Sequence, residues 1–335
     1  MINPEKTIFK HQDAIITIKQ LNQKKLKINV RPNNKNLFIP FKTCETSYSL
    51  ELIKKILDIK GPAYLCDEIL RDESTEYLQK SLKYCLLGYI KKKEFTNKRI
   101  LDFGCGSGSS SMILSKMFPD TQIVGIDLEK KLLQIARTRA KHYNFKNVSF
   151  LASPDPNSLP KKIGKFDYIL LSAVFEHMLP NERNILLPKI WTLLKTNGII
   201  FINRTPYRYF PFETHTTGLP IINYLPDKLC CLIARKFSKR NLQKDNWQVL
   251  LRKGIRGTSS KEIMKILQKK CDQKPLLLSP SHLGLKDNID LWHMQTNTKN
   301  KNRLKKILFY FLKFLHYTTG TSLTPSISLA IKKLT

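Results

Sequence analysis

Glycines and carboxylates in the middle of the chain have the types and spacing of a small-molecule binding site. Gly104, Gly106 and Gly108 alternate with small residues, and Asp102 stands two residues before the first of them. Because glycine has no Cβ, it lets the backbone turn sharply and approach a ligand closely. Asp127 follows the loop by about twenty residues, where nucleoside-binding units place a carboxylate on the ribose hydroxyls. The pattern therefore predicts a ligand that contains a nucleoside.

The details of this loop favour S-adenosylmethionine over a nicotinamide dinucleotide. The carboxylate of Asp102 beside the glycines suits a ligand that carries an ammonium and a sulfonium rather than a pyrophosphate. The dinucleotide fingerprint also requires a third glycine or an alanine at the position that Ser109 occupies here. We therefore expect S-adenosylmethionine as the cofactor.

The segments around the loop alternate between strands and helices. From Lys98 onward, short runs rich in β-branched residues are separated by helical stretches; the runs are RILDFG, QIVGID, NVSFLA, FDYILLS and GIIFIN. Such alternation predicts parallel strands joined by crossover helices. Ligands of these sheets bind at the carboxyl ends of the strands, which is where the glycines stand. The sequence thus indicates an α/β fold with a doubly wound sheet and helices on both faces.

Four motifs, in order, resemble those of the class I S-adenosylmethionine-dependent methyltransferases. LDFGCGSG resembles the loop that wraps the methionine part of the donor, and GIDLEKKLLQIA resembles the motif that carries the ribose-binding acid. DPNSLP, with Asp155 as the acid beside the adenine, precedes FDYILLSAVFEHM and LLKTNGIIFIN, which resemble the fourth and fifth strands. The resemblance implies a Rossmann-like, seven-stranded, mostly parallel sheet. It also implies a donor site made of Asp102, Gly104, Cys105, Gly106, Gly108, Asp127, Leu128, Asp155 and Ser172.

The acceptor is expected near the ends of the fourth and fifth strands. If the acceptor is a hydroxyl, a general base helps to remove its proton. His215, in a loop dense in proline, aromatic residues and threonine, is the first choice for that base, and Glu213 would orient it. His177 follows Glu176 and has either a catalytic role or a structural role in shaping the pocket.

Five segments are expected along the chain. The predicted division is a partly β appendage at 1–45, a helical leader at 46–97, the donor-binding core at 98–203, an acceptor-covering insertion at 204–258 and a C-terminal part of the catalytic domain at 259–335. Near 304–317 an apolar helix carries its lysines in one narrow sector. At about 21 Å it is too short to cross a bilayer, so it either packs in the core or a dimer seam, or lies in a membrane interface.

The composition restricts compartment and partners. The chain has 58 lysines and arginines against 26 acidic residues, a net charge of +32, which either attracts anionic partners or reflects a compositional bias. Its seven cysteines form no CxxC pair, so we expect no metal site and no disulfide framework. The N-terminus resembles no secretory signal and no segment reads as a bilayer span. We expect a cytoplasmic protein, with peripheral contact at the inner face of the membrane as the alternative for the apolar helix.

The absence of certain motifs restricts the class of acceptor. The fourth-strand region lacks the Asn/Asp-Pro-Pro-Tyr/Phe motif of enzymes that methylate exocyclic base nitrogens, and no Pro-Cys pair ends the fourth or fifth strand. No segment reads as an RNA-binding module. We therefore predict O-methylation of a small-molecule, glycan or lipid-linked acceptor, with the oligomeric state open. The alternatives are an RNA methyltransferase and a non-catalytic binding protein with the same fold. A nucleic-acid partner is therefore not favoured but stays open.

Overall fold

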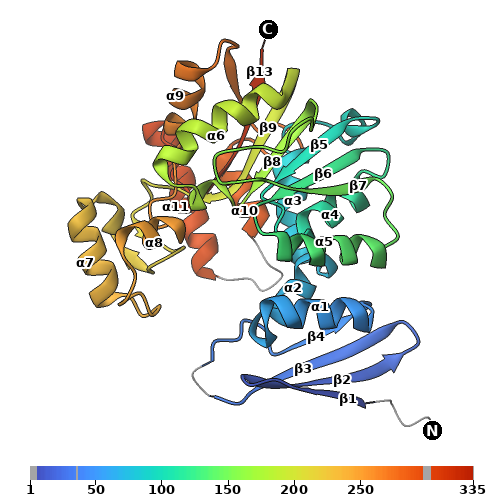
Figure 1. Ribbon diagram of the computed structural model, residues 1–335. Coiled ribbons are helices and arrows are strands. Elements are labelled where there is room, and N and C mark those ends of the chain that lie inside the picture. The colour runs from blue at the N-terminus through green and yellow to red at the C-terminus, as the bar shows by residue number, and fades with distance from the viewer. Residues whose placement is uncertain (1–5, 35–36, 297–302, 335) are drawn as a thin grey trace.

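The main body of the protein is a seven-stranded sheet covered by helices (Figure 1). The computed structural model describes residues 6–34, 37–296 and 303–334. The strand order is β12-β13-β9-β8-β5-β6-β7, in which β13 is antiparallel to both of its neighbours and the other pairs are parallel. The predicted mostly parallel, doubly wound sheet is thereby confirmed. Its strands are β5 (Arg99–Phe103), β6 (Gln122–Asp127), β7 (Val148–Ala152), β8 (Phe166–Ser172), β9 (Leu194–Pro206), β12 (Pro275–Leu278) and β13 (Ser326–Lys333).

The central strands send alternate side chains into two helical layers. In β5, Leu101 and Phe103 pack with one set of helices, whereas Ile100 packs with the other. This alternation follows from the two-residue period of a strand that is buried on both faces. The first layer contains α6 (Pro180–Leu193) and α9 (Ser260–Lys270), and the second contains α3 (Lys80–Leu87), α4 (Ser109–Met117) and α10 (Asn288–Thr296).

The N-terminal part forms a separate four-stranded antiparallel sheet, at the bottom of Figure 1. Its strands are β1 (Lys6–Lys10), β2 (Ala14–Asn22), β3 (Lys25–Pro32) and β4 (Thr43–Thr46), and α1 (Leu50–Lys60) and α2 (Leu65–Glu73) pack on it. Strands were expected at 14–18 and 27–30 and are found there. The β-like run 37–39 forms no strand, because β3 instead pairs with the later segment β4. Ile135 of α5 (Lys130–His142) joins this core, so the small sheet is tied to the donor-binding half.

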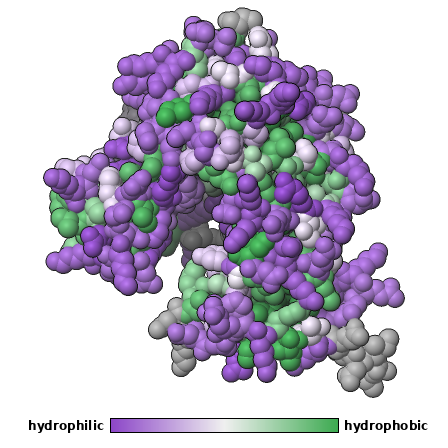
Figure 2. Space-filling model, in the orientation of Figure 1, coloured by the Kyte–Doolittle hydropathy of each residue, from purple (hydrophilic) through white to green (hydrophobic). Residues whose placement is uncertain are grey.

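The segment 204–258 builds a lobe of its own at the lower left of Figure 1. It contains the short pair β10 (Phe212–Glu213) and β11 (Leu219–Pro220), followed by α7 (Asp227–Phe237) and α8 (Trp247–Arg252). A small apolar cluster holds these elements together and includes Ile222, Cys230, Leu250 and Ile255. Hydrophilic side chains cover most of the face in Figure 2, and hydrophobic residues show at its left edge, over this lobe, as well as over the main body and the N-terminal part.

The predicted apolar helix is present as α11 (Arg303–Thr319), and it packs through a mixed face, on which Leu308, Phe309 and Leu312 contact the cluster of Ile289 and Trp292. Lys313 forms 2.6 Å ion pairs with Asp287 and Asp290, and Leu312 is the residue of the helix that is fully buried. The opposite face is apolar and open to solvent, with Leu304 76%, Ile307 65%, Phe311 55%, Phe314 63% and Tyr317 91% exposed. The expectation that this face is core therefore does not hold within one chain.

Among the described residues, no helix combines the length and the hydrophobicity that crossing a bilayer requires.

Candidate active site

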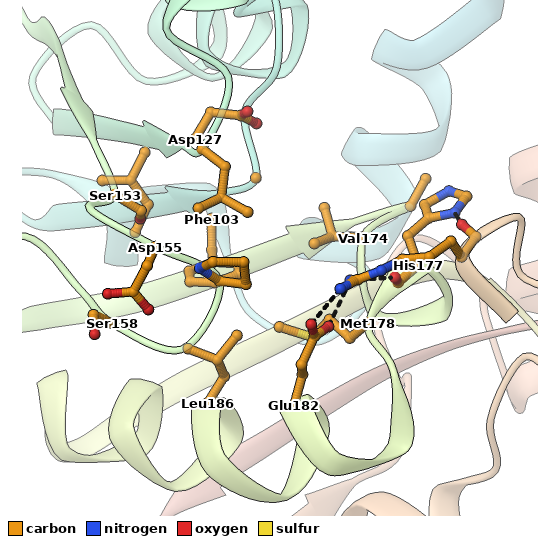
Figure 3. Close-up of a pocket in the computed structure, with 16 residues that line it drawn as sticks. Phe103, Asp127, Ser153, Asp155, Ser158, Val174, His177, Met178, Glu182 and Leu186 are labelled. Atoms are coloured by element: carbon orange, nitrogen blue, oxygen red, sulfur yellow. Dashed lines mark hydrogen bonds and ion pairs between the residues drawn. The ribbon is translucent and has the colours of Figure 1, made fainter. Parts of the chain in front are cut away.

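A pocket of about 260 Å³ opens at the carboxyl ends of β5, β6 and β8 (Figure 3). This is the edge at which ligands of open α/β sheets bind. Its wall combines the glycine loop, the ends of β6 and β7, and residues that follow β8. The lining residues used below are Gly104, Asp127, Leu128, Asp155, Val174, His177, Met178, Glu182 and Arg252.

The glycine loop has a backbone that larger residues could not adopt. Gly104 has φ +70°, and a Cβ there would lie 2.7 Å from the side chain of Val174. Gly108 has φ +84°, and its Cβ would lie 2.7 Å from Ala136 of α5. Cys105 is buried beneath the loop. The loop is therefore close-packed on its outer side, and Gly104 lines the pocket with backbone atoms alone.

Asp127 ends β6 and presents its carboxylate at the pocket. Oδ2 accepts a 2.8 Å hydrogen bond from the backbone N–H of Gly106, and Oδ1 accepts one of 2.9 Å from Glu129. Each oxygen keeps a further lone pair for a ligand hydroxyl. Its neighbour Leu128 lines the same wall with an exposed side chain. The structure thus brings together the residues that were predicted for a ribose.

Asp155 lies across the pocket from Asp127 (Figure 3). Hydrogen bonds from the Ser158 hydroxyl and the Asn157 N–H, the latter at 2.8 Å, lower the pKa of this carboxyl group. The carboxylate is exposed to solvent. Asp155 lies where the acid beside the adenine was expected, and its own side chain stabilises the loop through these hydrogen bonds.

Five of the nine predicted donor residues do not line this pocket: Cys105, Gly106 and Gly108 of the glycine loop, and Asp102 and Ser172. Asp102 points to the α4 side of the sheet, where its Oδ2 accepts hydrogen bonds of 2.7 and 2.5 Å from the hydroxyls of Ser110 and Ser111. Burial raises the pKa of Asp102 to about 6. Ser172 accepts a 2.9 Å hydrogen bond from the amide of Asn203, at the end of β9. Asp102 and Ser172 therefore face hydrogen-bond partners behind the pocket wall, and their contact with the donor stays a prediction.

A buried ion network supports the glycine loop from below. Arg139 of α5 is fully buried and donates to the Ser107 carbonyl at 2.9 Å and to the Glu68 carboxylate at 3.3 Å. The Ser107 hydroxyl donates to the same carboxylate at 2.5 Å. Burial alone would raise the pKa of Glu68, but the charges of Arg139, Lys60 and Arg71 outweigh it, and that pKa falls to about 2. The sequence analysis missed this network, because its members lie far apart in the chain.

The acceptor-side candidates do meet in space. The rings of His177 and His215 lie with centroids 5.6 Å apart, beside the buried carboxylate of Glu176. Nδ1 of His177 lies 2.7 Å from the carbonyl oxygen of Arg252 in α8. Since a carbonyl oxygen only accepts, Nδ1 must carry the hydrogen, and Nε2 is left with a lone pair. The insertion therefore reaches the pocket through α8, as expected for a segment that covers an acceptor.

Glu213 does not orient the His215 ring. Its carboxylate accepts hydrogen bonds from the backbone N–H groups of His215, Thr216 and Thr217, at 2.7, 2.8 and 2.5 Å. Arg240 donates to the carbonyl of His215 at 2.5 Å from the other side. We therefore correct the predicted role: Glu213 fixes the backbone of the loop that carries His215, because both of its oxygens are already engaged by that backbone.

Sequence reasoning did not single out the ion pair of Glu182 with Arg252, two residues that line the pocket; its dashed hydrogen bonds end on the labelled Glu182 in Figure 3. One of its two hydrogen bonds is 2.5 Å long. Glu182 is buried at the start of α6, and it also accepts a 2.9 Å hydrogen bond from the Leu179 N–H. Only the fold brings these two residues together, so no local signal in the sequence could have revealed the pair.

The chemistry of the wall fits S-adenosylmethionine. Asp127 keeps acceptor lone pairs for a diol, and Asp155 adds a second carboxylate. At Gly104, a Cβ of any larger residue would collide with the side chain of Val174. The same wall offers no cluster of basic side chains for a pyrophosphate, since Arg252 is its one lysine or arginine among the described residues. The wall thus favours S-adenosylmethionine over a nicotinamide dinucleotide, as the sequence did.

Comparisons with known proteins give the family. A model of the methyltransferase domain matches residues 94–270, more than half of the chain. The ubiquinone biosynthesis O-methyltransferase of Pelagibacter ubique is 36% identical over 110 residues, 33% of this chain and 43% of that protein. The malonyl-[acyl-carrier protein] O-methyltransferase of Bacillus cereus is 29% identical over 142 residues, 42% of this chain and 50% of that protein. The chain thus spans half or less of the length of these curated relatives.

Among solved structures, the chain is similar to the plantazolicin methyltransferase BpumL in complex with a monoazolic desmethylPZN analog and SAH. It has a TM-score of 0.45 and 14% identity, covering 85% of this chain and 97% of that one. PKMT2 from Rickettsia typhi has a TM-score of 0.45 and 17% identity, covering 77% and 52%. The family model, together with the sheet order and the donor-side pocket described above, confirms the resemblance seen in the sequence. The chain belongs to the methyltransferase domain family and contains a class I S-adenosylmethionine-dependent methyltransferase domain.

Proposed function

We propose that this protein methylates a hydroxyl oxygen of a small-molecule, glycan or lipid-linked acceptor. The observation that carries the proposal is that one pocket has Asp127 and the glycine loop on one wall and His177 on another. A donor held by the first wall would therefore have its reactive end near groups that can handle a proton. Two relatives that are named O-methyltransferases support oxygen as the acceptor atom.

The donor-side residues have separate roles in this proposal. Asp127 accepts hydrogen bonds from the ribose hydroxyls, Asp155 borders the adenine, and the glycine loop contacts the methionine part through its backbone. When bound, S-adenosylmethionine supplies an electrophilic methyl group. Most of the rate enhancement then comes from holding the acceptor oxygen in line with that group, since alignment replaces an improbable encounter.

The proton of the acceptor hydroxyl leaves through the histidine pair. His177 offers Nε2, because its Nδ1 donates to the Arg252 carbonyl. His215 stands beside it on a loop whose backbone Glu213 and Arg240 hold from both sides. A base held this firmly loses little entropy when it meets the acceptor. We keep His215 as the first choice for the general base and His177 as its neighbour in the same role.

The exposed face of α11 supports a lipid-linked acceptor. We propose that this face docks on an anionic membrane surface. The helix, RLKKILFYFLKFLHYTT, has no acidic residue, and a chain with a net charge of +32 is attracted to anionic lipid. Since α11 packs on the protein through Leu308, Leu312 and Lys313, the apolar residues on its outer side are free to enter the interface.

Transfer of label from [methyl-³H]S-adenosylmethionine to cell fractions tests the acceptor class. We expect label in the organic-extractable or polar small-molecule fraction, resistant to nuclease and to protease. Label that nuclease releases would overturn the proposal in favour of RNA. A folded, donor-binding protein that labels no fraction would favour a non-catalytic role.

Flotation with vesicles tests the docking. We expect the wild type to float with anionic vesicles and to be released by salt, whereas Phe311→Glu with Phe314→Glu stays in solution. Phe38→Glu is the matched control, because Phe38 is an equally exposed aromatic residue, 75% accessible, in the N-terminal sheet region. A wild type that stays in solution at low salt, or a double variant that still floats, would exclude docking through α11.

A further inference from the structure

We propose that Glu176, His177 and His215 bind a divalent first-row transition cation, such as Zn²⁺ or Mn²⁺, at the acceptor end of the pocket. One oxygen of Glu176 and one nitrogen of each histidine all lie within 4.8 Å of one another. Two imidazole nitrogens and one carboxylate oxygen are a donor set that such cations use, with positions left open for other ligands.

The buried carboxylate of Glu176 has an oxygen without a partner. Oε2 accepts a 3.1 Å hydrogen bond from the hydroxyl of Thr205 in β9, whereas Oε1 is buried and has no hydrogen-bond partner. The residue is 0% exposed. Leaving a polar atom of this kind unsatisfied is costly. A cation bound between Glu176 and the two histidines would remove that cost.

His177 already has the hydrogen-bond arrangement of a metal ligand. Its Nδ1–H donates to the backbone carbonyl of Arg252 at 2.7 Å, which fixes the tautomer and directs the lone pair to Nε2. Metal-ligating histidines usually donate their second N–H to a carbonyl or carboxylate in this way. The same contact restrains the ring before any ion arrives.

Space for the ion is kept open by a glycine. Gly254 follows α8 with φ +90°, and a Cβ there would lie 3.1 Å from Nε2 of His215 and 3.3 Å from Cγ of Glu176. A larger residue would therefore crowd both ligands at once. Because Glu213 and Arg240 fix the backbone of His215, the ring is held near Glu176 rather than free in solvent.

The bound cation would act on the acceptor. In the ion-bound form both histidines are ligands, so the cation would take over the role that the proposed function gives to the histidine base. It would retain open positions, and a hydroxyl oxygen that took one of them would become more acidic and lose its proton to water. This role rests on the proposed function, whereas the binding of the ion does not. It also restricts the substrate to acceptors whose reactive hydroxyl can reach a metal ion.

Calorimetry on the full chain, treated with a chelator and then dialysed, tests the site directly. Zn²⁺ and Mn²⁺ are the probes, and Mg²⁺ is the hard-cation comparison, which we expect to bind weakly because it prefers all-oxygen ligands. We expect one Zn²⁺ per chain. His215→Ala and Glu176→Gln should each weaken it at least about 10- to 100-fold, since even outer-shell partners of a metal site are worth that much.

Controls separate this site from surface binding and from misfolding. His11→Ala is the matched control, because His11 also lies near a carboxylate, 3.5 Å from Asp13, but in the N-terminal sheet region, and it should bind Zn²⁺ as the wild type does. Donor affinity, measured on the same samples, should be unchanged in His215→Ala. A wild type that binds donor but no Zn²⁺, or Zn²⁺ binding equal in wild type and His215→Ala, overturns the metal site alone. A folded wild type that binds no donor overturns the proposed function instead.

Discussion

The two walls of the pocket are built in different ways. The donor wall consists of local segments, in which the residues that face the ligand follow directly from a strand, as Asp127 follows β6. The acceptor wall is assembled from the end of β8, a loop after β9 and α8, which meet only in the fold. A site whose residues come from single strand ends can be predicted from the sequence. A site whose residues come from segments far apart in the chain depends on tertiary contacts, which the spacing of residues in the sequence does not reveal. The donor wall should accordingly control affinity for the donor, and the acceptor wall should control turnover.

The largest effect is expected at Asp127. Asp127→Ala would lose two charge-assisted hydrogen bonds to a ribose, each worth about 1.5 kcal/mol or more, so donor affinity should fall at least about 100-fold. Equilibrium dialysis with labelled donor measures it. Asp155→Ala is the matched comparison and should cost no more than about tenfold, because its carboxylate is exposed. Equal losses in the two variants would contradict the assignment of the ribose to Asp127.

A comparable effect, on stability, is expected at Arg139. Arg139→Met leaves the buried carboxylates of Glu68 and Asp72 without their guanidinium and should lower the free energy of unfolding by about 3 to 5 kcal/mol. Urea unfolding measures the change. Arg137→Met, on the same helix but exposed, removes only a hydrogen bond to the Phe150 carbonyl and should cost about 1 kcal/mol. If both variants cost the same, the network does not support the donor loop.

The predicted donor residues that line the pocket are those whose place depends on a strand end. Asp127, Gly104 and Asp155 each stand at the carboxyl end of a strand or directly after it. Asp102 is not among the lining residues, which could not be foreseen because the sequence does not show which face of β5 borders the pocket. Arg139 and Glu68 were missed, since a buried ion pair between distant helices leaves no local pattern.

The acceptor wall was predicted in part. His177 and His215 were named from their setting after the fourth and fifth strands, and they do meet. The role given to Glu213 was wrong, because closeness in sequence does not say whether a carboxylate faces a ring or the backbone. The exposure of the apolar face of α11 likewise could not be predicted from the sequence, since hydrophobic periodicity predicts an apolar face but not what covers it.

A smaller effect is expected at His215. His215→Ala should lower turnover about 100-fold, at the lower end of what a general base contributes, while donor affinity changes by less than about twofold. Steady-state kinetics together with donor titration separates the two quantities. A loss of donor affinity as large as that of Asp127→Ala would show that the two walls are not functionally distinct.

The smallest effect concerns acid stability. Glu68 has a folded-state pKa of about 2 against an ordinary value of 4.5, so its stabilising contribution is present above pH 4.5 and is lost as the pH falls toward 2. Between pH 7 and pH 3.5 the wild type should therefore lose about 1 kcal/mol more stability than Glu68→Gln does. Urea unfolding at the two pH values measures this difference. Parallel losses in both proteins would mean that Glu68 is not held ionised by Arg139.

The central claim is that the pocket between the glycine loop and the end of β6 holds the methyl donor. Calorimetric titration of the wild type with S-adenosylhomocysteine, the stable product of the donor, tests it most directly. The account predicts a single site per chain, with the binding heat abolished in folded Asp127→Ala. A folded wild type that shows no binding up to ~1 mM ligand, or an Asp127→Ala variant that binds as tightly as the wild type, would contradict it.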